Sequence, residues 1–289
     1  MDKKVTIVIP TFNRANFVVK TIESALNQTV QCNIIVCDHG SSDNTPEVVS
    51  KYKDRITYIR REKDFGPHFC WLEGILNAET EFVHLHFDDD ILQPSFVEKT
   101  LALMSEDVGM VFCDAATYDH NAGKITNPVL FNFQKRWSTG IYKSKLLEKI
   151  LLKRGLMLSP AICLYRKKDF VDAMFPGQLP VDFGGEYHGV GVDIFISLLT
   201  CLRYPKFGIV AEPLACFGVH DGSITIDAMH DREKNTKLYK AYDSYRKYYC
   251  LIKLYKKCVL IRCITSFMSL GFIKLVKLFL KVIGLRKKG

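Results

Sequence analysis

The amino-acid sequence predicts an α/β protein with a mostly parallel sheet that is covered by helices on both faces. Over the first 113 residues, compact apolar runs alternate with segments in which apolar residues recur at helical spacing. Such alternation is typical of parallel strands joined by crossover helices. Polar clusters follow three of the apolar runs, and sheets of this class bind ligands beyond the carboxyl ends of their strands. The composition suits a globular chain, because 48% of the 289 residues are hydrophobic and 25% are charged.

The predicted elements follow one another in a regular order. Strands are expected at 5–10, 33–37, 56–59, 81–87 and 108–113, with helices at 15–29, 45–53, 67–78 and from Pro94 to about Met104. The segment 114–192 is rich in Gly, Pro and aromatic residues, and we expect it to be less regular, with mobile loops. A helix at 193–201 and two short strands around Pro213 complete the predicted body.

Charge is distributed unevenly along the chain. The formal net charge is +9, yet no Asp or Glu follows Asp243 and twelve Lys or Arg residues do, so residues 1–243 are slightly acidic. A basic tail of this kind points to an anionic surface, either nucleic acid or lipid. The acidic body lacks a basic stripe with stacking aromatics, so we expect no nucleic-acid binding.

Cysteine usage and the apolar segments predict a cytoplasmic protein. None of the ten cysteines forms a CxxC pair, and most lie in apolar runs, which is typical of buried free thiols in a reducing compartment. The N-terminal residues enter a strand pattern without the organisation of a signal peptide. The longest uncharged stretch of the tail, residues 263–273, is shorter than the roughly 20 residues that cross a bilayer.

The acidic run Asp88, Asp89 and Asp90 is the strongest single candidate for chemistry. It directly follows the apolar strand predicted at 81–87. Three adjacent carboxylates repel one another and favour a counter-charge, which Mg²⁺ or Mn²⁺ can supply through carboxylate oxygens. Such an ion can bridge to a diphosphate and neutralise a leaving nucleotide. The alternative is a solvated acidic turn that caps the next helix.

Other polar residues lie at predicted strand ends or helix starts. Asp38 ends the second strand and could accept hydrogen bonds from a base or ribose, or form an Asx-turn. Asp193 opens a predicted helix and could be a general base or an N-cap, with Glu186 as a second candidate base. His220 could ligate a metal, meet phosphate or be structural. Walker, GxGxxG, GxSxG and HExxH motifs do not occur, which removes several enzyme classes.

The ordered motifs of the chain resemble those of family 2 glycosyltransferases. They are "VTIVIPTFNR", "IIVCDHGSSDNT", the Gly66 region, "AETEFVHLHFDDDIL" and "VHDGSIT", and they cover about residues 3–225. The resemblance implies a GT-A fold with a Rossmann-like sheet, a nucleotide-sugar donor, Mn²⁺ or Mg²⁺, and inversion at the anomeric carbon. A UDP-sugar is favoured as the donor, with dTDP or GDP as other possible bases. Relatives of this kind serve in bacterial surface polysaccharide synthesis.

The same resemblance assigns expected roles to residues of this chain. Asp90 and Asp88 match the DxD motif and are the expected metal contacts, with His220 near the donor phosphates and the metal. Asp193 matches the catalytic base. The expected donor-binding residues are Pro10, Thr11, Asn13, Arg14, Asp38, Gly66, Asp88, Asp89 and His220.

The chain departs from the family pattern at three places. His39 stands where a second Asp is common, and Val192 precedes Asp193 where a Glu is usual. The usual Ala-Arg-Asn after the Gly66 loop is replaced by Cys70, Trp71 and Leu72. The Arg and Asn that often support the donor are therefore missing.

The expected organisation has two halves and a tail. Residues 1–113 form the nucleotide-sugar-binding half, 114–243 the acceptor-binding half, and 244–289 a basic amphipathic helical tail. From residue 251 the lysines and the apolar residues fall on different sides, which suits a helix in an anionic membrane interface on the inner face of the plasma membrane. The alternative is a helix that packs on the catalytic domain.

A membrane-bound tail favours a lipid-linked saccharide acceptor. A polyprenyl-phosphate sugar synthase and a sugar-nucleotide binding protein without catalysis are the rival functions. The sequence does not predict an oligomeric state.

Overall fold

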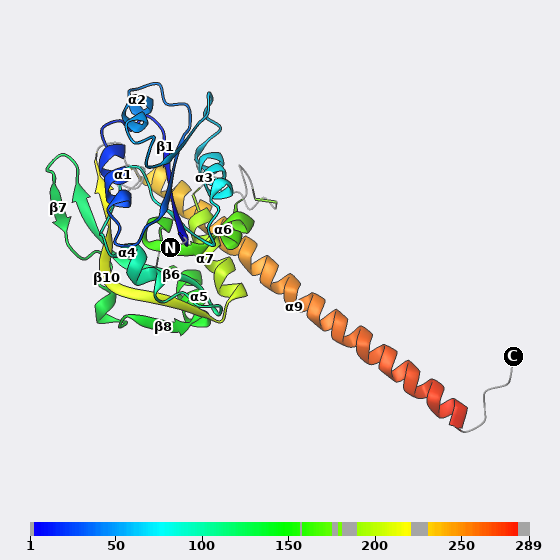
Figure 1. Ribbon diagram of the computed structural model, residues 1–289. Helices are drawn as coiled ribbons and strands as arrows, with labels where there is room; N and C mark the ends of the chain where they lie inside the picture. Colours follow the sequence, from blue (N-terminus) through cyan, green and yellow to red (C-terminus); the bar gives the residue numbers. More distant parts are fainter. Residues whose placement is uncertain (1–2, 157, 175–178, 181–189, 221–230, 283–289) are drawn as a thin grey trace. The chain divides into compact units, whose positions relative to one another are not determined.

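The computed structural model describes residues 3–156, 158–174, 179–180, 190–220 and 231–282, with side chains described as far as Cys258. The chain divides into two compact units, residues 1–246 and 247–289. The long helix α9 (Arg232–Val282) begins in the first unit (Figure 1). Among the described residues, no helix combines the length and the apolar character needed to cross a bilayer.

The first half of the sheet consists of four parallel strands. These are β1 (Val5–Thr11), β2 (Asn33–Asp38), β3 (Thr57–Arg60) and β4 (Phe82–Leu85), in the spatial order β3-β2-β1-β4. The register pairs Thr11 with Asp38 and Asp38 with Arg60, so three strands end together. Strand β1 is buried throughout, which explains its continuous apolar run.

The second half of the sheet joins β4 through an antiparallel strand, β9 (Cys163–Arg166). Beyond it lie β6 (Val108–Asp119) and β10 (Lys206–Val219), which are parallel to each other. The antiparallel strands β5 (Ile91–Leu92), β7 (Lys124–Asn127) and β8 (Gly140–Lys143) complete the ten-stranded sheet. Strands β1, β2, β3, β4, β6 and β10 therefore run in one direction, and the sheet is mostly parallel.

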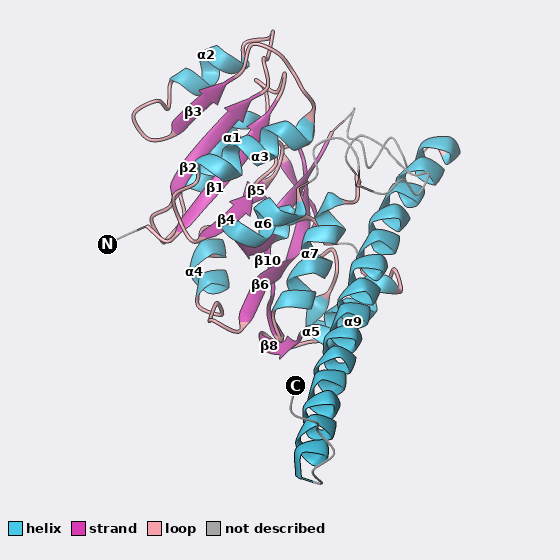
Figure 2. Ribbon diagram, turned by 90° about the vertical axis from the view of Figure 1, so that its right-hand side faces the viewer, coloured by secondary structure: helices cyan, strands magenta, loops and turns pink. Residues whose placement is uncertain are grey.

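Helices cover both faces of the sheet (Figure 1). One side carries α1 (Val18–Leu26) and α4 (Phe96–Leu101). Gln28, which follows α1, accepts a hydrogen bond from the Val97 N–H of α4. The other side carries α3 (Pro67–Asn77), α6 (Lys167–Ala173) and α7 (Val192–Arg203) (Figures 1 and 2). Helix α5 (Ser144–Leu152) packs on α7, and α2 (Thr45–Ser50) follows β2. Short 3₁₀ turns occur at Phe133–Lys135 and Pro160–Ile162.

The structure confirms the predicted fold class and corrects several elements. The described part of the segment 114–192 is more regular than expected, since it contains β7, β8, α5, β9 and α6. The two strands expected around Pro213 are one strand, β10, whose register against β6 shifts at Val210, Pro213 and Ala215. Proline lacks the N–H that a ladder needs, which accounts for the irregularity. The tail helix starts at Arg232 and not near residue 251.

Candidate active site

The loops after β1 and β2 lie side by side at the carboxyl edge of the sheet. Asn13 has a left-handed backbone with φ of 54°, and its Oδ1 accepts the Ser42 N–H at 2.8 Å. The Arg14 N–H donates to Thr45 Oγ1 at 2.9 Å, and the His39 N–H donates to the Thr11 carbonyl at 3.0 Å. These hydrogen bonds join the predicted nucleotide-binding loop to the loop after β2. Pro10 precedes it within β1 and pairs with Cys37 of β2.

Asp38 is buried at the end of β2, with an exposed fraction of 1%. Its Oδ1 accepts the Ser41 N–H at 2.8 Å, as in the Asx-turn alternative, and its Oδ2 accepts the Tyr58 hydroxyl at 2.6 Å. The Arg60 guanidinium Nε lies 3.5 Å from the same Oδ2 and is 46% exposed. The residue that presents hydrogen-bond donors to solvent here is therefore Arg60, which the sequence did not single out.

The acidic run forms a turn after β4, and Thr21 of α1 is hydrogen-bonded to the backbone of this turn. The Asp90 N–H donates to the Phe87 carbonyl at 3.1 Å. Thr21 Oγ1 lies 2.9 Å from the carbonyl oxygens of both Asp88 and Asp90. Arg14 Nε lies 3.9 Å from Asp88 Oδ1, so the structure brings the first loop and the acidic turn together.

The three carboxylates have different surroundings. Burial and the charge of Asp89 raise the pKa of Asp88 to about 7, against the opposing effect of Arg14. Burial and Asp89 also raise the pKa of Asp90 well above its ordinary value. Asp90 Oδ1 accepts the Gly218 N–H at 2.9 Å, while its buried Oδ2 has no hydrogen-bond partner among the described residues. A cation at this turn would favour the ionised form of both groups.

Two histidines hold Asp89. His220 Nε2 lies 2.8 Å from Asp89 Oδ2, and His120 Nε2 lies 2.7 Å from the Asp89 carbonyl oxygen. The Phe17 ring contacts both imidazoles, with ring centroids 4.5 Å from His220 and 4.7 Å from His120. His220 therefore meets the acidic turn through Asp89. The sequence analysis did not predict a role for His120. This residue directly follows β6, in the segment 114–192 that was expected to be irregular.

Gly66 is the N-cap of α3 and has a φ of 93°, a conformation that favours glycine. Its N–H donates to Asp64 Oδ1 at 2.7 Å, and His39 Nδ1 lies 2.7 Å from the same oxygen. His39, which replaces the common second Asp, therefore ties the end of β2 to the loop before α3. Trp71 of α3 contacts Phe87, with ring centroids 5.4 Å apart.

Asp193 lies in the first turn of α7, after Gly191. Its Oδ1 accepts the Ile194 N–H at 2.8 Å, and its Oδ2 accepts the Tyr242 hydroxyl of α9 at 3.0 Å. Burial raises the pKa of Asp193 to about 6, although these hydrogen bonds oppose the shift. The pKa of Asp193 therefore lies nearer to neutrality than that of an ordinary aspartate. Glu186, the second candidate base, lies outside the described residues.

The described residues contain no cluster of three or more His, Cys, Asp or Glu side chains arranged to hold a metal ion. The unpartnered Oδ2 of Asp90 and the raised pKa of Asp88 are nevertheless consistent with two carboxylate ligands of a cation. Mg²⁺ is commonly held by one or two carboxylates, with substrate phosphates and water as the other ligands. The acidic turn fits a cation that arrives with a diphosphate.

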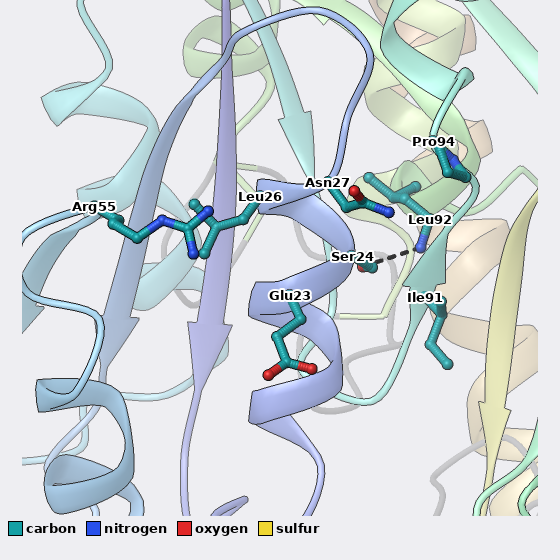
Figure 3. Close-up of a pocket in the computed structure, with 8 residues that line it drawn as sticks. All are labelled: Glu23, Ser24, Leu26, Asn27, Arg55, Ile91, Leu92 and Pro94. Carbon is teal, nitrogen blue, oxygen red and sulfur yellow. Dashed lines mark hydrogen bonds between the residues drawn. The ribbon is translucent and has the colours of Figure 1, made fainter.

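A pocket of about 450 Å³ lies apart from the predicted site residues, between α1 and β5 (Figure 3). Its lining residues are Glu23, Ser24, Leu26, Asn27, Arg55, Ile91, Leu92 and Pro94. Ser24 Oγ accepts the Leu92 N–H at 3.2 Å, which ties α1 to the strand that follows the acidic turn. None of the residues predicted for catalysis, donor binding or metal binding lines this pocket.

The family model named Glycosyl transferase family 2 matches residues 6–172, which include the first loop, the acidic turn and β9. The chain belongs to glycosyl transferase family 2. Its relatives include an uncharacterized glycosyltransferase of Rickettsia felis, 34% identical over 108 residues, which are 36% of this chain and 18% of the relative. Glycosyltransferase GlyG of Streptococcus pneumoniae is 27% identical over 128 residues, or 43% of this chain and 42% of GlyG. The chain thus spans less than half the length of these relatives.

Solved structures show that this family member has the GT-A fold. The S. aureus TarS fragment 1–349 in complex with UDP-GlcNAc matches 82% of this chain and 71% of its own, with a TM-score of 0.59 and 17% identity. The mannosyltransferase PcManGT from Pyrobaculum calidifontis, in complex with GDP-Man and Mn²⁺, matches 78% of this chain and 60% of its own, with a TM-score of 0.52 and 13% identity.

Proposed function

We propose that the chain transfers a sugar from a nucleoside diphosphate donor to a hydroxyl of a saccharide acceptor, with inversion. The observation that carries this proposal is the Asp90 carboxylate, buried at a strand end with one oxygen unpartnered among the described residues. It lies in the same turn as Asp88, and Arg14 of the first loop is 3.9 Å from Asp88. A cation at Asp90 and Asp88 would neutralise the charge that develops on a departing diphosphate.

The donor is expected to lie across the carboxyl edge of the first half of the sheet, residues 1–113. The first loop and Arg60, which the buried Asp38 holds in place, are the proposed contacts of the nucleoside, and Gly66 shapes the neighbouring loop. The TarS fragment was solved with UDP-GlcNAc and PcManGT with GDP-Man and Mn²⁺, which supports a nucleotide-sugar donor and a divalent metal. A UDP-sugar is the favoured donor, with dTDP or GDP as other possible bases.

Asp193 is the proposed catalytic base. In a single displacement, its carboxylate accepts the proton of the acceptor hydroxyl while the acceptor oxygen bonds to the anomeric carbon. The bond from that carbon to the diphosphate oxygen breaks on the opposite face, and the nucleotide leaves with the electron pair. A pKa of about 6 suits this role, because the carboxylate is mostly ionised at neutral pH. The second half, residues 114–243, is the proposed acceptor side.

The proposed acceptor is lipid-linked, and the tail is the proposed membrane contact at the inner face of the plasma membrane. Within the second unit, the exposed residues Leu251, Leu254 and Tyr255 recur at spacings of three and four. These residues form an exposed apolar stripe, and Lys253, Lys256 and Lys257 lie in the same turns of the helix. This combination suits an interfacial helix. This location is compatible with a role in surface polysaccharide synthesis.

The donor is tested by thermal unfolding of the full chain with UDP-, GDP-, dTDP- and CMP-sugars, each with and without Mn²⁺. We expect one donor to raise the Tm in the presence of Mn²⁺ and to be hydrolysed slowly. Binding without hydrolysis or transfer would favour a sugar-nucleotide binding protein. Transfer to a polyprenyl phosphate would favour the synthase. A chain that binds none of these donors would overturn the proposal.

The tail is tested separately, by co-sedimentation with vesicles that contain anionic lipid. The chain without residues 251–289 should remain in the supernatant while the full chain sediments. Equal sedimentation of the two chains would remove the membrane role without affecting the donor site.

A further inference from the structure

The first turns of α9 supply a side chain to the proposed catalytic base. Tyr242 is 8% exposed, and its hydroxyl donates to Asp193 Oδ2 at 3.0 Å. Burial raises the pKa of Tyr242, with the Asp193 charge as a further cause, so the phenol keeps its proton and remains a donor. Helix α9 therefore contacts the proposed catalytic base through a residue that lies 49 positions from it in the chain.

The start of α7 lies close to α9 at a sterically defined contact. Gly191, the N-cap of α7, has a φ of 107°, and a Cβ at this position would lie 2.3 Å from the Tyr245 ring and 3.1 Å from the Ala241 carbonyl. Only glycine allows α9 to approach this near to the start of the base-bearing helix. Tyr242 follows Ala241 directly, so the same approach places its hydroxyl on Asp193.

Charged residues that follow Tyr242 tie this part of α9 to α5. Arg246 Nε donates to the Leu151 carbonyl at 3.0 Å, and its Nη1 donates to Asp243 Oδ1 at 3.0 Å. Asp243 also pairs with Arg154, which follows α5. Tyr242 therefore lies on a part of α9 that is hydrogen-bonded to α5, as a positioning residue requires.

We propose that Tyr242 is a positioning residue that holds the Asp193 carboxylate in its reactive orientation and favours its ionised form. The proposal rests on the role of Asp193 as the base. Asp193 Oδ1 accepts the Ile194 N–H, and Oδ2 accepts the Tyr242 hydroxyl, the one side chain among the described residues that hydrogen-bonds to this carboxylate.

Among the described residues, two further titratable groups that interact with Asp193 come from β9. Cys163 and Tyr165 interact with it electrostatically, and burial raises the pKa of both, so neither carries charge near neutral pH. Arg246 and Tyr239 act on Tyr242 itself. Tyr242 is therefore the side chain whose removal should change the ionisation of Asp193 most directly.

The test compares the full chain with Tyr242→Phe, Tyr239→Phe and Asp193→Asn. Tyr239 lies on the same helix and is 46% exposed, so its variant is the matched control. The Asp193 carboxyl resonance of aspartate-¹³C-labelled protein is followed by NMR as the pH is varied, and Asp193→Asn identifies it. Release of UDP from UDP-GlcNAc with Mn²⁺, and transfer with any donor that binds, are measured over the same pH range.

Removal of the Tyr242 hydroxyl should raise the titration midpoint of Asp193 by on the order of one unit, since a hydrogen bond to the charged form is lost. The acid limb of the rate profile should move to higher pH by the same amount, and Tyr239→Phe should change neither. A midpoint in Tyr242→Phe that equals the wild-type value would overturn the inference. Full transfer by Asp193→Asn would instead overturn the base assignment, whatever the Tyr242 variant does.

Discussion

The backbone of Gly218 lies directly against the backbone of Asp89. A Cβ at Gly218 would lie 2.2 Å from the Asp89 carbonyl oxygen and 2.9 Å from His120 Nε2. The Gly218 N–H also donates to Asp90 Oδ1 at 2.9 Å. The end of β10 and the acidic turn therefore fit together only because position 218 has no side chain.

Replacement of Gly218 by Ala should displace the acidic turn. We expect the free energy of unfolding to fall by about 1–3 kcal/mol, as for other overpacked sites, and UDP binding in the presence of Mn²⁺ to weaken. Urea unfolding and calorimetry measure the two effects. Gly140→Ala in β8 is the control, because its added Cβ would meet no atom within 4 Å. Wild-type donor binding in Gly218→Ala would show that the turn tolerates displacement.

Replacement of Asp90 by Asn should separate metal binding from stability. The amide keeps an oxygen for the Gly218 N–H but removes a carboxylate whose burial and like-charged neighbours disfavour ionisation. We expect the Tm without metal to stay the same or rise, and the further increase caused by Mn²⁺ with UDP to disappear. An unchanged Mn²⁺ effect would place the cation elsewhere.

Arg60 should contribute to binding of the nucleoside. Its guanidinium is 46% exposed beside the buried Asp38 carboxylate, so its outward N–H groups can donate to carbonyl oxygens of a base. We expect Arg60→Ala to weaken UDP binding about tenfold, which corresponds to about 1.4 kcal/mol. Calorimetry with Arg55→Ala as the control measures this effect, since Arg55 is exposed and lines the separate pocket of Figure 3. Equal affinity of the two variants would exclude a role for Arg60.

His84 should make the fold sensitive to acid. It is fully buried, and burial lowers its pKa from 6.5 to about 4. The unfolded chain therefore binds a proton between these values that the folded chain does not, so stability falls as the pH drops from 6.5 towards 4. The full effect is on the order of 3 kcal/mol.

The variant His84→Asn tests this acid sensitivity. Its amide can still donate to the Cys163 carbonyl, which lies 2.9 Å from His84 Nδ1, but it does not titrate. Urea unfolding at neutral and acidic pH should show a smaller loss of stability for the variant than for the wild type. Equal losses would assign the acid sensitivity to other groups.

Local sequence patterns predicted the first half of the fold well because each strand and the polar cluster after it are contiguous. The apolar runs that form β1, β2 and β4 are buried. The residues that follow each run lie at the carboxyl edge because they are adjacent to the strand in the chain. Strand β9 gave no such signal. It has four residues, is buried on both faces and enters the sheet antiparallel between β4 and β6, so neither alternation nor position along the chain marked it.

The sequence by itself determined the family, the mostly parallel sheet, and the candidates Asp38, Asp88, Asp90 and Asp193, because these depend on residue types at short spacing. Only the tertiary structure decided what surrounds each carboxylate. Asp90 is hydrogen-bonded to Gly218, which is 128 residues away in the chain, and Asp193 is hydrogen-bonded to Tyr242, which is 49 residues away. Those neighbours depend on the pairing of β5 with β10 and on where α9 begins, and burial by distant segments sets the ionisation of each group.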